Sequence, residues 1–113
     1  MKLAIIGSRG INEINIDEYI DSSVTEIVSG GARGVDTLAK KFALSNGIKI
    51  VEFLPDYKKY RRGAPILRNK EIVDYADKVL VFWDGESKGS KSVIDYAKKI
   101  SKPCEVIIIR VVN

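Results

Sequence analysis

The chain contains no histidine and a single cysteine, Cys104, among its 113 residues. Without histidine it cannot form a Ser-His-Asp triad or a zinc site of cysteine and histidine ligands, and one cysteine excludes an internal disulfide. Long apolar runs are also missing, because stretches such as residues 79–83 and 106–109 are far too short to cross a bilayer. Met1 leads into a predicted strand rather than a signal peptide. We therefore expect a cytoplasmic protein without a membrane segment, a metal site or a bound cofactor.

The composition indicates one domain and a preference for anionic partners. With 45% hydrophobic residues, 113 residues are enough to bury one core, so we expect a single domain over residues 1–113. The net charge is +4, which favours anionic ligands without identifying them. Lys58, Lys59, Arg61 and Arg62 form the densest basic cluster, either a solvated loop or an anion contact.

Short apolar runs alternate with helical patterns along the chain. Residues 2–6, 26–28, 49–53, 79–83 and 105–111 are predicted strands, and their nearly continuous apolar character is typical of a buried parallel sheet. Helical periodicity covers 35–43, 66–76 and 93–100, and a weaker pattern covers 14–22. The alternation predicts an α/β, Rossmann-like three-layer sandwich with a parallel five-stranded sheet in the order 3-2-1-4-5.

Three glycine-containing loops follow predicted strands 1, 2 and 4. Gly7-Ser8-Arg9-Gly10 is the first, Ser29-Gly30-Gly31-Ala32-Arg33-Gly34-Val35-Asp36 the second, and Asp84-Gly85-Glu86-Ser87-Lys88-Gly89-Ser90 the third. In open parallel sheets a ligand lies at the carboxyl ends of the strands, near the point where the strand order reverses. Glycines allow backbone N–H groups to approach an anion, and helix N-termini attract phosphate. Together the loops predict a nucleotide-like ligand.

Several of these residues also have a structural interpretation. The second loop is either a phosphate cradle or an ordinary strand-to-helix turn, and Ser90 either binds a ligand or caps its helix. Asp36 either complements a helix dipole or accepts hydrogen bonds from a sugar. Trp83 either stacks on a base or covers the sheet edge. The predicted ligand-binding residues are Gly7, Ser8, Arg9, Gly30, Gly31, Ala32, Arg33, Gly34, Asp36, Arg68, Asn69, Asp84, Gly85, Ser87, Gly89 and Ser90.

These motifs occur together in an order that resembles the YspA/YpsA-like branch of the SLOG superfamily, over nearly the whole chain. The resemblance rests on the first and second loops, on Arg68-Asn69, and on the segment from Phe82-Trp83-Asp84-Gly85 to Lys88-Gly89-Ser90. It implies a Rossmann-like domain that binds a nucleotide or a nucleotide-derived ligand, of ADP-ribose or nucleotide-sugar type, at the carboxyl edge of the sheet. It also implies self-association into a homodimer or a larger homo-oligomer.

Two related families imply alternative functions. The DprA family shares the Gly-Ser-Arg and Arg-Asn elements and implies binding of single-stranded nucleic acid. The Lonely Guy phosphoribohydrolases imply cleavage of a base from a nucleoside monophosphate, with Arg68 as the candidate catalytic residue. Where that family has a glutamate in a Gly-Thr-x-x-Glu segment, this chain has Val93. Glu86, Asp84 or Asp36 would then have to supply the missing carboxylate, so binding is favoured over catalysis.

Overall fold

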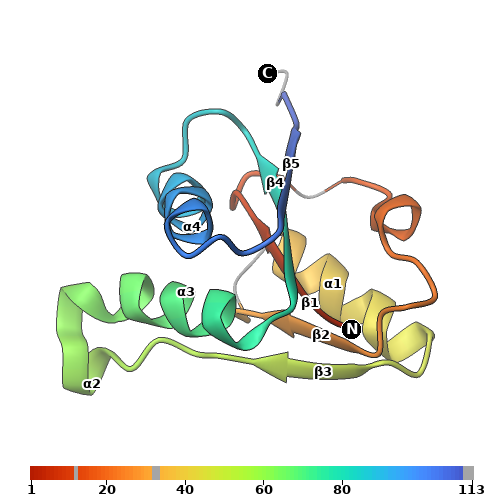
Figure 1. Cartoon of the computed structure of the whole chain (residues 1–113), viewed down its shortest axis with the longest axis horizontal. Coiled ribbons are helices and arrows are strands. Elements are labelled where there is room, and N and C mark those ends of the chain that lie inside the picture. Colours follow the sequence, from red (N-terminus) through yellow and green to blue (C-terminus); the bar gives the residue numbers. More distant parts are fainter. Residues whose placement is uncertain (12, 32–33, 111–113) are drawn as a thin grey trace.

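The sheet has five strands, all parallel, in the order β3-β2-β1-β4-β5 (Figure 1). The structure is a computed structural model that describes residues 1–11, 13–31 and 34–110. The strands are β1 (Lys2–Gly7), β2 (Glu26–Ser29), β3 (Lys49–Glu52), β4 (Lys78–Trp83) and β5 (Cys104–Ile108). Both the strand order and the Rossmann-like α/β class predicted from the sequence are confirmed.

Helices cover both faces of this sheet. They are α1 (Val35–Ser45), α2 (Tyr57–Tyr60), α3 (Ala64–Tyr75) and α4 (Lys88–Lys99), with 3-10 turns η1 (Ile16–Tyr19) and η2 (Arg61–Gly63). On one face Val35, Ala39 and Ala43 of α1 pack on the odd-numbered side chains of β1. On the other face α3 and α4 pack on Ala4, Val79 and Val81, so successive strand residues face opposite cores (Figure 1).

Local sequence signals set the ends of the helices. Gly34 precedes α1 with a φ of +73°, a conformation that favours glycine. α3 carries Pro65 in its first turn, where the missing N–H costs nothing. Ser87 caps α4, because its side chain accepts a hydrogen bond from the backbone N–H of Ser90. These boundaries place the starts of α1 and α4 at the same edge of the sheet.

The main difference from the sequence prediction concerns residues 14–22. Only Ile16–Tyr19 form a helix, and it is a single 3-10 turn without a side-chain cap at Asn15. Ile16 is buried in the α1-side core, so packing of this side chain holds the segment in place rather than a helix of its own. β5 ends at Ile108, short of the predicted 111, which itself lies outside the described residues.

Within the described ranges no helix is long and apolar enough to cross a bilayer. In the same part of the chain no group of three or more cysteine, aspartate or glutamate side chains is arranged to hold a metal ion.

Candidate functional site

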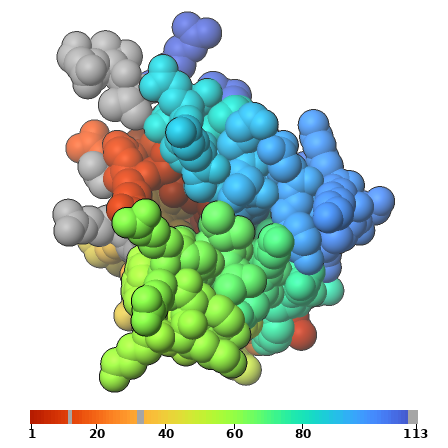
Figure 2. Space-filling model, turned by 90° about the vertical axis from the view of Figure 1, so that its left-hand side faces the viewer, coloured from red at the N-terminus to blue at the C-terminus, as the bar shows by residue number. Residues whose placement is uncertain are grey.

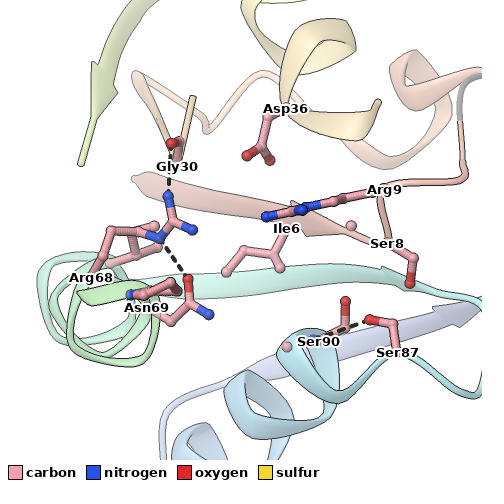
Figure 3. A pocket seen from close by; sticks show the side chains of 13 residues that line it. Ile6, Ser8, Arg9, Gly30, Asp36, Arg68, Asn69, Ser87 and Ser90 are labelled. Atoms are coloured by element: carbon pink, nitrogen blue, oxygen red, sulfur yellow. Dashed lines mark hydrogen bonds between the residues drawn. The ribbon is translucent and has the colours of Figure 1, made fainter. Parts of the chain in front are cut away.

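A pocket of about 250 Å³ lies at the carboxyl edge of the sheet, between β1, α3 and the start of α4 (Figure 3). Ten of the sixteen predicted ligand-binding residues line it: Gly7, Ser8, Arg9, Gly30, Asp36, Arg68, Asn69, Ser87, Gly89 and Ser90. Gly31, Gly34, Asp84 and Gly85 do not line it, and Ala32 and Arg33 lie outside the described residues. The pocket therefore joins all three glycine-containing loops with one face of α3.

The first turn of α4 forms one wall of the pocket. Ser90 is 3% exposed, and its hydroxyl makes no hydrogen bond within the part of the chain that the structure describes. A Cβ added to Gly89 would meet no atom of the described residues within 4 Å, so their packing does not explain a glycine at this position. Because Ser87 is the cap, the interpretation of Ser90 as the N-cap is wrong. The wall presents helix N–H groups and the Ser90 hydroxyl, an arrangement suited to an anion.

The loop before α4 is held by its own hydrogen bonds. The Asp84 carboxylate accepts from the backbone N–H of Glu86 at 2.9 Å and of Ser87 at 2.8 Å. These two donors, Ser87 first, hold the pKa of Asp84 below its ordinary value. The Trp83 Nε1–H donates to the Ser87 carbonyl at 3.0 Å, while the ring packs against the α3- and α4-side core. Asp84 and Trp83 thus shape the loop that carries Ser87 into the pocket.

Arg68 holds the opposite end of the pocket together. Its Nη1 donates to the Gly30 carbonyl at 2.8 Å and to the Phe53 carbonyl at 3.4 Å, and its Nε donates to Asn69 Oδ1 at 2.8 Å (Figure 3). The side chain joins the loops after β2 and β3 to α3. Burial lowers the pKa of Arg68, partly offset by Asp36, yet the guanidinium remains charged at neutral pH.

Asp36 and Arg9 lie across the pocket from Ser87 and Ser90 (Figure 3). Asp36 stands in the first turn of α1 and is 9% exposed, whereas Arg9 is exposed at the rim. A buried carboxylate is a poor neighbour for phosphate but a good acceptor for sugar hydroxyls. The two walls therefore differ in chemistry: one offers N–H and hydroxyl groups, the other a carboxylate.

Three apolar residues complete the pocket and were not among the predicted site residues. They are Ile6, Pro65 and Ile72. Ile6 comes directly before Gly7, and Pro65 and Ile72 stand three residues before and four residues after Arg68 on the same helix. Pro65 and Ile72 could have been found from the sequence, because residues three or four positions from Arg68 lie on the same face of a helix. Their side chains provide an apolar surface between the polar walls.

Packing explains several glycines of the predicted cradle. A Cβ at Gly7 would overlap the Val35 side chain, and one at Gly30 would lie 2.5 Å from Arg68 Nη1. A Cβ at Gly34 would lie 2.8 Å from the Ile11 carbonyl oxygen. These positions need glycine for close approach within the protein, independently of any ligand.

Comparison with protein families identified one match. The model of the YspA, cpYpsA-related SLOG family matches residues 1–60. This stretch includes the first and second glycine-containing loops and ends before Arg68 and before the loop that leads into α4. Searches of curated proteins and of solved structures each found no match.

Proposed function

Since the chain belongs to the YspA, cpYpsA-related SLOG family, we propose that its pocket binds the phosphate and sugar of a nucleotide or nucleotide-derived molecule, of ADP-ribose or nucleotide-sugar type. Family membership suggests nucleotide-related binding in general terms. The finer proposal depends on one observation, the wall formed by Gly89 and Ser90.

Gly89 supports a ligand at this wall through the space that surrounds it. Gly89 is the second residue of α4, in the first turn, where the backbone N–H groups have no partner within the helix. Among residues 1–11, 13–31 and 34–110, no neighbouring atom lies within 4 Å of the position that its Cβ would take. An anion that approaches the backbone closely gives a physical reason for the missing side chain. The Ser90 hydroxyl then supplies a further donor to the same anion.

The remaining groups fit a sugar next to that phosphate. The Asp36 carboxylate lines the far wall and accepts hydrogen bonds from hydroxyl groups, and Ile6 and Ile72 contact the faces of the ring. At about 250 Å³ the pocket is slightly smaller than most small-molecule sites, which span roughly 300–1,000 Å³. It has room for one phosphorylated sugar and part of a base, with Arg9 at the rim as an additional cation.

Thermal unfolding with adenosine monophosphate and ADP-ribose tests this proposal. At a ligand concentration 100-fold above Kd, binding stabilises the folded state by about 2.7 kcal/mol. Gly89→Asp places a carboxylate at the expected phosphate position and should abolish the increase in Tm. Gly63→Asp is the matched control, because Gly63 also stands at the start of a helix, has nothing within 4 Å of its Cβ position, and does not line the pocket. No change in Tm with any member of a broad nucleotide panel would overturn the proposal.

Asp36 favours a second candidate function, phosphoribohydrolase activity. Of the three candidate carboxylates for the role of the missing glutamate, Asp36 lines the pocket while Asp84 and Glu86 do not. Val93 is buried in the α3- and α4-side core. For this function, purified protein must release free base from a nucleoside monophosphate, and Asp36→Asn must stop the release while nucleotide binding persists. Absence of free base after prolonged incubation excludes it.

A further inference from the structure

A second cavity lies beside the pocket, in the groove between α2 and α3. It measures about 240 Å³ and is here called the α2–α3 groove. Its lining consists of Leu54, Asp56, Lys59, Tyr60, Ala64, Leu67, Arg68 and Glu71. Three large apolar side chains in it are exposed: Leu54 by 69%, Tyr60 by 40% and Leu67 by 36%. These apolar side chains lie next to the charged groups of Asp56 and Lys59 in the same cavity.

The α2–α3 groove and the pocket are neighbours, because Arg68 lines both. Leu54 of the groove also borders the loop after β2, which carries the pocket residue Gly30. A Cβ added to Gly31 in this loop would lie 2.7 Å from Leu54 Cδ2. Figure 2 shows that α2 and the start of α3 lie on the same face of the molecule as the start of α4. A molecule that extends from the pocket over Arg68 therefore reaches the groove.

The groove combines an aromatic ring with charges of both signs, because Lys59 and Arg68 line it together with Asp56 and Glu71. The Lys59 ammonium lies 5.2 Å from the centroid of the Tyr60 ring. Lys58, Arg61 and Arg62 are exposed in the same short segment, so residues 56–63 carry four cations against the single carboxylate of Asp56. Bases stack on exposed aromatic rings while neighbouring cations hold the phosphates, which is how proteins bind nucleotides without sequence preference.

Charge argues against a second copy of this chain as the occupant. If two copies met through this groove by a two-fold axis, each would place its four cations against the same four of its partner. An anionic occupant would be attracted to the same charges.

We propose that the α2–α3 groove is a subsite for a second nucleoside, so that the preferred ligand contains two nucleosides joined through phosphate. The proposal rests on the proposed function, since the first nucleotide occupies the pocket. The linking phosphate passes over Arg68, and the second base stacks on Tyr60 between Leu54 and Leu67. The pocket alone is too small to enclose both halves of such a ligand.

Calorimetric titration with three probes tests this subsite. The probes are adenosine monophosphate, diadenosine diphosphate, in which a pyrophosphate joins the nucleosides, and 5′-phosphorylated diadenylate, in which a phosphodiester joins them. We expect at least one two-nucleoside probe to bind about ten-fold more tightly than adenosine monophosphate, a gain that one stacked base supplies. Tighter binding of diadenosine diphosphate indicates a free dinucleotide, and tighter binding of diadenylate indicates a single-stranded nucleic acid.

Two variants test whether Tyr60 provides the expected gain in affinity for the two-nucleoside probe. Tyr60→Ala should reduce affinity for the two-nucleoside probe to that for adenosine monophosphate and leave the latter unchanged. Tyr57→Ala is the matched control, because Tyr57 is an exposed tyrosine on the same helix that lines neither cavity. If adenosine monophosphate binds and neither larger probe binds more tightly, the subsite is refuted while the proposed function stands. If no probe binds, the subsite is refuted, and the broad nucleotide panel decides the proposed function separately. A dimer in solution that Tyr60→Ala dissociates would show that a second copy fills the groove, and would also refute the subsite.

Discussion

Replacement of Arg68 by alanine should destabilise the protein in the absence of any ligand. The change removes the hydrogen bonds to the Gly30 carbonyl and to Asn69, both 2.8 Å long, and the weaker one to the Phe53 carbonyl. Hydrogen bonds to charged groups contribute about 1.5–3 kcal/mol each, and the partial exposure of Arg68 reduces that contribution. Gly30 is buried, so the loss also leaves its carbonyl without this donor. We expect a decrease of about 2–4 kcal/mol in the free energy of unfolding.

Thermal unfolding followed by circular dichroism measures this effect. For 113 residues the entropy of unfolding is about 0.24 kcal/mol/K, so the expected decrease in Tm is about 8–17 °C. Arg68→Lys should give an intermediate value, because lysine retains the charge but not the planar fork. Arg62→Ala is the matched control, since Arg62 is exposed and lines neither cavity. If Arg68→Ala unfolds within 2 °C of the parent protein, the conclusion that Arg68 holds these loops together is wrong.

Two further predictions concern the loops around the pocket. Gly7→Ala should destabilise the protein by about 1–3 kcal/mol, because its Cβ would overlap Val35, whereas Gly10→Ala has open space and should not; urea unfolding measures both. The pKa of Asp84 lies below its usual value of 3.8, so its ionised form adds stability above that pH, and this contribution is lost as the pH falls through the lowered pKa. Asp84→Asn should therefore be less stable than the parent protein at pH 7, and the difference should shrink at pH 3. A difference that is constant between the two pH values would contradict this account.

The sheet was predictable because its strands are short, apolar and bounded by glycine, and because right-handed crossovers leave few possible strand orders. The α2–η2 segment was not, since four residues followed by three are too few to show helical periodicity. A local signal does exist there, because the Asp56 side chain accepts from the backbone N–H of Lys59 at 3.1 Å, as a cap does. Two exposed tyrosines, Tyr57 and Tyr60, lie beside the basic cluster, and only the packing of α2 beside α3 shows that Tyr60 lines the α2–α3 groove.

Arg68 shows the limit of the sequence argument for the site. The sequence placed Arg68 on a helix near the correct edge and suggested a role toward the ligand or in catalysis. Its hydrogen-bond partners Phe53 and Gly30 lie 15 and 38 residues away in the chain, and no local pattern encodes such contacts. Two of the three nitrogens of the guanidinium donate to protein atoms, so at least part of its role is to fix the shape of the pocket.

The glycines near the pocket serve two different purposes. Gly7, Gly30 and Gly34 have protein atoms where a Cβ would stand, so their identity follows from the packing of α1 and Arg68 against the ends of β1 and β2. Gly89 has no such neighbour and still lines the pocket. Packing does not require a glycine here, and close approach of an anion to the free N–H groups of this first turn gives a reason for one. Of the two glycine-containing loops that the sequence predicts to hold phosphate, after β2 and before α4, the Gly89-Ser90 pair at the start of α4 therefore gives the stronger support for a phosphate site.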